Sequence, residues 1–92
     1  MTTNQKTVKI QNVRGLHARA TAEFVKLADT FSGEVYVINE QGLRVNGKSI
    51  MGLLMLGASM GTILTIETEG ESSDEILEKL IDLVNNKFGE DA

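Results

Sequence analysis

The alternation of hydrophobic and polar positions predicts four β-strands along the chain. Val8 and Ile10 alternate with polar neighbours, as in a strand with one buried face. Residues 39–42 are polar and separate two short apolar segments, which predicts a hairpin. The predicted strands cover residues 6–11, 35–38, 43–45 and 62–68.

Three further segments have the apolar spacing of helices. Ser72 and Glu75 predict a capping box, and Gly33 and Gly89 are predicted to end the first and third helices. The predicted helices cover residues 18–31, 50–56 and 72–88. The order β-α-β-β-α-β-α predicts an α+β fold, a two-layer sandwich with a four-stranded, largely antiparallel sheet and three helices on one face.

Length and composition narrow the class of protein. The 92 residues favour a single domain, residues 1–92, and the 41% of hydrophobic residues suffice for a buried core. Cysteine is absent, which excludes a disulfide framework and thiolate metal sites. Because no signal-type segment and no apolar run of ~20 residues occurs, we expect a cytoplasmic protein without membrane insertion.

Charge is distributed unevenly along the chain. Residues 1–50 have a net charge of +3 and residues 51–92 a net charge of −7, which gives −4 in total. This asymmetry indicates that anionic ligands or partners meet the first half. An acidic, solvated last helix explains the same asymmetry, and both interpretations stay open.

Residues 15–19, Gly-Leu-His-Ala-Arg, lie where the first loop meets the first helix. A helix N-terminus has unpaired backbone N–H groups and a partial positive charge, and both attract phosphate. We expect His17 to be an exposed nucleophile there, with Arg19 in the same turn. One histidine and no cysteine disfavour zinc, and no serine or carboxylate has a spacing to His17 that indicates a hydrolytic triad. We therefore expect no metal and no cofactor.

Two motifs resemble those of the HPr family of phosphotransferase-system carriers. Residues 12–19, Asn-Val-Arg-Gly-Leu-His-Ala-Arg, closely resemble the phosphohistidine signature of the family. Residues 46–54, Asn-Gly-Lys-Ser-Ile-Met-Gly-Leu-Leu, resemble its second signature, around a regulatory serine. The motifs match in residue type and in their separation, and the predicted element order matches the family's fold.

The resemblance implies a stoichiometric phosphoryl carrier rather than an enzyme. A phosphoenolpyruvate-dependent general phosphotransferase would phosphorylate His17, which would pass the group to downstream acceptor proteins. Arg19 would contact the phosphoryl group, and the backbone N–H groups of Ala18 and Arg19 would complete its binding site. Ala20 stands where the family commonly has proline, which resembles the branch linked to nitrogen metabolism. Sugar uptake and nitrogen-related regulation therefore both stay open.

Ser49 precedes the second helix, where serine is an ordinary N-cap. The resemblance implies that a kinase also phosphorylates Ser49 and a phosphatase reverses this, with a charge change of about −1.5 to −2. The helix that follows is apolar on nearly every side, so we expect Leu53 and Leu56 to be buried. The expected docking patch for partners consists of the exposed residues Ile50, Met51 and Leu54.

Two other functions are compatible with parts of the sequence. A regulatory binding module would act through Ser49 without a phosphoryl relay, but it would need neither His17 nor Arg19. A nucleic-acid-binding domain would use the basic first half, but the overall acidity and the 4% of aromatic residues argue against it. We therefore expect protein partners, no nucleic acid and a monomer.

Overall fold

The structure is a computed structural model that describes residues 3–92, and these form four strands and three helices in the predicted order. The strands are β1 (Thr3–Lys9), β2 (Glu34–Ile38), β3 (Arg44–Asn46) and β4 (Ile63–Glu69). The helices are α1 (Ala18–Ala28), α2 (Ile50–Met55) and α3 (Ser73–Asn85), followed by a 3₁₀ turn, Lys87–Gly89.

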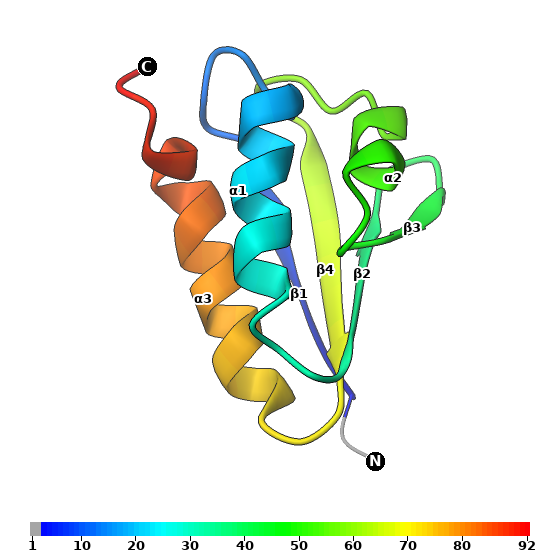
Figure 1. The fold of residues 1–92 in the computed structure, drawn as a ribbon. Coiled ribbons are helices and arrows are strands. Elements are labelled where there is room, and N and C mark those ends of the chain that lie inside the picture. The colour runs from blue at the N-terminus through cyan, green and yellow to red at the C-terminus, as the bar shows by residue number, and fades with distance from the viewer. Residues whose placement is uncertain (1–2) are drawn as a thin grey trace.

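The strands form one antiparallel sheet in the order β1-β4-β2-β3, and the three helices cover one face of it (Figure 1). The central strand β4 pairs Leu64 with Val8 of β1 and Ile66 with Val37 of β2. All four side chains are buried, while their neighbours along β4 are more exposed. The predicted fold class and the alternation from which it was inferred are therefore confirmed.

The helices close the core over the sheet. α1 and α3 lie side by side, and α2 packs beside α1 and against β3 (Figure 1). Phe24 of α1, Leu53 of α2 and Leu80 of α3 point into this layer and are buried. Burial of each such side chain contributes roughly 1.5–3 kcal/mol, so apolar spacing decides where each helix lies.

Three predicted helix ends differ in the structure, two of them at the end of α1 and the start of α3. α1 ends at Ala28, because the N–H groups of Thr30 and Phe31 bond to carbonyl oxygens only three residues back and tighten the last turn. The capping box at Ser72 is wrong: this residue has a left-handed φ of 64° and its side chain makes no capping bond. A capping side chain needs an extended backbone, and here only the backbone carbonyl of Ser72 accepts from the Glu75 N–H.

A turn of left-handed residues follows α3. Lys87, Phe88 and Gly89 have φ values of 58°, 55° and 83°, and only glycine adopts this region without strain. The ring of Phe88 is buried, and this burial offsets the strain of the turn. The predicted continuation of the helix to Phe88 is therefore wrong, and the turn sends Glu90 back toward the start of α1.

Candidate functional site

His17 is the N-cap of α1. Its backbone is extended, with φ −82° and ψ 179°, and its Nδ1 accepts a hydrogen bond from the backbone N–H of Arg19 at 3.3 Å. A side chain that caps a helix in this way satisfies one of the first N–H groups, which have no partner within the helix. The imidazole therefore lies at the positive end of α1, with Nδ1 facing the helix.

The loop before His17 is fixed against the loop before β4. Gly15 has a φ of 65°, and a Cβ atom there would come 2.5 Å from the carbonyl oxygen of Ala58. The backbone N–H of Leu16 donates to the same oxygen at 2.9 Å. A side chain at position 15 would displace this loop, so Gly15 sets the path by which the chain enters α1.

A carboxylate from the other end of the chain contacts the imidazole. Oε2 of Glu90 lies 2.5 Å from Nε2 of His17. Because Nδ1 accepts from the Arg19 N–H, the ring proton lies on Nε2, which donates to the carboxylate. Nδ2 of Asn12 donates to Oε1 of Glu90 and to the carbonyl oxygen of Gly15, both at 2.9 Å.

This contact leaves the imidazole less exposed than the sequence predicts. The side chains of His17 and Glu90 are 17% and 11% exposed. Sequence reasoning found no carboxylate for His17, because Glu90 is 73 residues away and belongs to a short polar segment without periodicity. The one signal in the sequence is Gly89, whose permissive backbone allows a sharp turn just before Glu90.

The surroundings of Glu90 keep its carboxyl group ionised. Burial raises the pKa of this group, but the hydrogen bonds from Asn12 and His17 and the positive charge of Arg14 outweigh burial. The pKa therefore lies below its ordinary value of 4.5. At neutral pH, the carboxylate is a permanent acceptor for the Nε2–H of His17.

Two arginines lie near the histidine. Arg19, exposed in the first turn of α1, and Arg14 line a shallow cavity of about 420 Å³, closed on the other side by Val13 and the residues after α3. A guanidinium group binds phosphate oxygens through paired N–H donors. Arg14 lies within the first motif, but sequence reasoning gave it no role. The phosphate-binding roles of Arg19 and of the Ala18 and Arg19 backbone N–H groups stay predictions.

Ser49 is the N-cap of α2, as its ordinary structural interpretation predicts. Its Oγ accepts a hydrogen bond from the backbone N–H of Gly52 at 3.0 Å. The side chain is half-buried, with the chain extended at φ −112° and ψ 115°. Its regulatory phosphorylation stays a prediction.

The short helix α2 divides its apolar side chains between core and surface. Leu53 and Leu56 are buried, as predicted. Ile50, Met51 and Leu54 are 43%, 73% and 38% exposed. Sequence reasoning missed Met55, which is 71% exposed and extends the same surface. The start of α1 and the helix α2 lie at the same end of the molecule (Figure 1).

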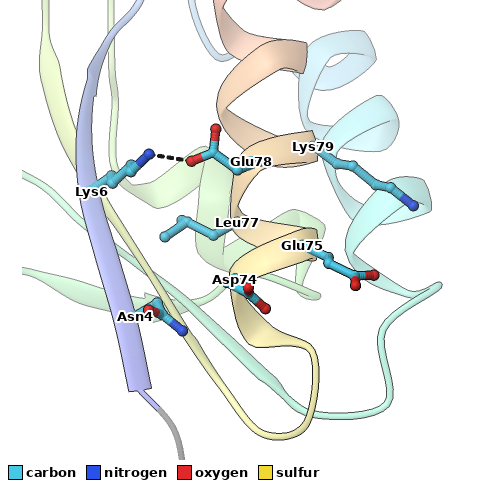
Figure 2. A pocket seen from close by; sticks show the side chains of 7 residues that line it. All are labelled: Asn4, Lys6, Asp74, Glu75, Leu77, Glu78 and Lys79. Carbon is cyan, nitrogen blue, oxygen red and sulfur yellow. Dashed lines mark hydrogen bonds and ion pairs between the residues drawn. The ribbon is translucent and has the colours of Figure 1, made fainter.

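A larger cavity, of about 610 Å³, lies at the opposite end of the molecule, between β1 and the first turns of α3 (Figures 1 and 2). The exposed side chains of Lys6 and Glu78 form an ion pair there (Figure 2), of the kind that contributes little to stability. Among residues 3–92, no group of three His, Cys, Asp or Glu side chains could hold a metal ion. No helix within this range is long and apolar enough to cross a membrane.

The match to a family model decides the family to which the chain belongs. Residues 4–86 match the model described as the PTS HPr component phosphorylation site. The chain belongs to the HPr family. The match includes α1 and α2 but ends before the turn after α3, so Glu90 lies outside the part that the HPr model describes.

Individual relatives agree with this assignment. The phosphocarrier protein HPr of Neisseria meningitidis is 46% identical over 86 residues, which cover 94% of this chain and 96% of the relative. The crystal structure of HPr-C-His from Thermoanaerobacter tengcongensis is 40% identical, with a TM-score of 0.90, and the match covers 97% of this chain and 99% of that one. The family is one of phosphocarriers of the phosphotransferase system, which are not catalysts in the ordinary sense.

One of the solved relatives is a dimer. A second crystal structure from T. tengcongensis is of an HPr dimer, 42% identical to this chain, with a TM-score of 0.75. The match covers 90% of this chain and 94% of that one. The monomer expected from the sequence stays a prediction, which a measurement of mass in solution decides.

Proposed function

We propose that this protein accepts a phosphoryl group on His17 from a phosphoenolpyruvate-dependent general phosphotransferase and passes it to downstream acceptor proteins. The supporting observation is the position of His17 as the N-cap of α1, where Nδ1 faces the Arg19 N–H and Nε2 is protonated. Nδ1 then holds the lone pair that attacks phosphorus. Membership in the HPr family supports the same chemistry.

In the transfer step, the lone pair of Nδ1 forms the N–P bond while the bond between phosphorus and the donor group breaks. The electron pair of the broken bond stays with the donor. The Arg19 N–H, which bonds to Nδ1 in the free protein, then donates to a phosphoryl oxygen instead. Arg19 and Arg14 line the adjacent cavity and supply positive charge for the transferred group.

We propose further that partners dock on the patch formed by Ile50, Met51 and Leu54, and that phosphorylation of Ser49 weakens this docking. The patch is exposed and follows Ser49 directly along the chain. A phosphoryl group at the N-terminus of α2 meets a favourable helix dipole, so the fold tolerates it. An apolar partner surface does not, because it would have to cover a charge.

Incubation with phosphoenolpyruvate and the general phosphotransferase tests the proposal. Wild-type protein should take up one phosphoryl group, and His17→Ala should take up none, because His17 is the one histidine in the sequence. Phosphate on nitrogen should be lost in mild acid and survive in base. Lys26→Ala changes an exposed residue in the last turn of α1 and keeps the histidine, so it serves as the control.

An acid-stable product, or full labelling of the His17→Ala variant, would contradict the relay. The regulatory alternative makes a different prediction. A binding module that acts through Ser49 alone would take up no phosphoryl group from the general phosphotransferase, yet it would still accept phosphate on Ser49 from a kinase.

A further inference from the structure

The carboxylate of Glu90 has no role in the proposed phosphoryl relay, although it contacts the side chain of His17. Its Oε2 lies 2.5 Å from Nε2 of His17, on the ring nitrogen opposite the one proposed to attack. At this distance, the contact is a charge-assisted hydrogen bond, roughly twice as strong as a neutral one. It therefore influences both the position of the ring and its charge.

We propose that Glu90 is a positioning residue for phosphoryl transfer: it holds the imidazole with Nε2 protonated and balances the positive charge that the ring gains when Nδ1 binds phosphorus. The inference rests on the proposed function of His17. It adds to the HPr signature a residue that lies outside the matched region, 4–86.

The position of Glu90 is set by groups other than His17. Phe88 is buried two residues earlier, and the backbone N–H of Val13 donates to the carbonyl oxygen of Ala92 at 3.1 Å, two residues later. Nδ2 of Asn12 holds the second carboxylate oxygen at 2.9 Å, and Asn12 itself is fully buried. Because Asn12 and the backbone on either side of Glu90 hold the carboxylate independently of His17, it can orient the ring.

Charge conservation gives the carboxylate a function in the step itself. When the lone pair of Nδ1 forms the N–P bond, the ring keeps its Nε2 proton and becomes formally positive. The negative charge of Glu90 compensates this charge at the nitrogen that carries the proton. On transfer to the acceptor, the electron pair of the N–P bond returns to Nδ1, and the ring is neutral again.

A negative carboxylate near a phosphoryl group would also repel it. Two features limit this repulsion. The carboxylate contacts Nε2, whereas the phosphoryl group binds Nδ1, so the imidazole ring lies between them. Arg14 and Arg19 line the cavity beside Glu90 together with Asp91, so the two positive charges there exceed the one further negative charge. The net effect of Glu90 is therefore favourable to the phosphorylated ring.

Two variants of Glu90 separate orientation from charge. Glu90→Gln keeps an oxygen that can accept from Nε2–H but removes the charge, and Glu90→Ala removes both. Asp82→Asn is the matched control, because it removes one negative charge from an exposed position of α3. The measurements are the rate of phosphorylation by the general phosphotransferase at varied protein concentration and the ring N–H signal of ¹⁵N-labelled His17.

We expect a downfield Nε2–H signal in the wild type that exchanges slowly with water, a weaker shift in Glu90→Gln and loss of the signal in Glu90→Ala. The maximal transfer rate should fall about ten-fold in Glu90→Ala and less in Glu90→Gln, with an unchanged half-saturating concentration. The control should match the wild type in both measurements.

The possible failures are distinct. A wild-type protein that takes up no phosphoryl group overturns the relay itself, and the role of Glu90 with it. A wild type that is phosphorylated no faster than Glu90→Ala, or an Nε2–H signal that is unchanged in Glu90→Ala, overturns the role of Glu90 and leaves the relay intact. Circular dichroism of the variants must show the wild-type fold. If Glu90→Ala unfolds, Glu90→Gln still tests the proposal.

Discussion

The backbone N–H of Arg19 donates to Nδ1 of the His17 side chain at 3.3 Å, so one residue of α1 contacts the proposed nucleophile through its backbone while its guanidinium group stays exposed. The two parts of Arg19 are therefore separable by mutation. A change of side chain leaves the N–H in position and removes only the guanidinium group.

We predict that Arg19→Ala slows phosphoryl transfer by about ten-fold to a hundred-fold, because charge-assisted hydrogen bonds contribute about 1.5–3 kcal/mol each. The free energy of unfolding should change by less than about 0.5 kcal/mol, because the side chain is exposed. Arg19→Lys should restore the rate only in part, since an ammonium group lacks the paired donors. Quenched time courses of phosphoryl transfer measure the rate, and urea titrations measure the free energy of unfolding. An unchanged rate in the alanine variant would remove Arg19 from the site.

Ser49→Asp should keep the fold but raise the half-saturating concentration for phosphorylation of His17 by about ten-fold, because a charge beside the docking patch must be desolvated in the complex. Aspartate caps a helix well, so the stability of the free protein should be close to that of the wild type. Ser49→Ala loses the hydrogen bond from the Gly52 N–H and should cost about 1 kcal/mol without a change in docking. Equal half-saturating concentrations for the two variants would leave Ser49 as a helix cap alone.

The lowered pKa of Glu90 predicts a pH-dependent contribution to stability. Because the pKa is lower in the folded protein than the ordinary 4.5, the ionised carboxylate stabilises the fold fully above pH 4.5. This contribution is lost as the pH falls through the folded-state pKa. The difference in unfolding free energy between the wild type and Glu90→Gln should therefore shrink as the pH falls below 4.5. A difference that grows as the pH falls would have the wrong sign and contradict this assignment.

Phe88→Ala should destabilise the protein by about 3–5 kcal/mol, the usual cost of removing a buried phenyl ring. It should also loosen the segment that holds Glu90, since burial of the Phe88 ring helps to offset the strain of two left-handed residues, Lys87 and Phe88. Phe88→Leu keeps an apolar side chain, so it should destabilise the protein less and loosen the Glu90 segment less. Thermal unfolding measures the stability, and hydrogen exchange of the Val13 and Glu90 amides, which donate to Ala92 and Lys87, measures the loosening. Equal exchange in all three proteins would show that Phe88 does not anchor the segment.

The strands and helices could be predicted from the sequence because burial in this fold follows simple periods. Leu64 and Ile66 alternate with exposed positions, and Phe24 and Leu80 recur at helical spacing. The N-terminal position of His17 was predictable for a similar local reason, since Gly15 breaks the strand pattern just before the apolar stripe begins.

The incorrect predictions at Ser72 and Phe88, and the missed contact of Glu90, have a different origin. Ser72 has the residue type of a cap, but its backbone is left-handed, and residue type does not encode that conformation. Phe88 continues the helical stripe because it is buried, although the backbone around it is no longer helical. The contact between Glu90 and His17 depends on both the fold and this turn, and no local pattern contains either.

The hydrogen bond between His17 and Glu90 can form only late in protein synthesis, because the two residues are 73 positions apart in the chain. A chain emerging from the ribosome exposes His17 early, when its Nε2 has only water as a partner. The carboxylate joins it only after the last turn has left the exit tunnel and Phe88 has found the core. On the roles proposed above, a chain that lacks this last turn has His17 without the counter-charge of Glu90, and we expect it to accept phosphoryl groups more slowly.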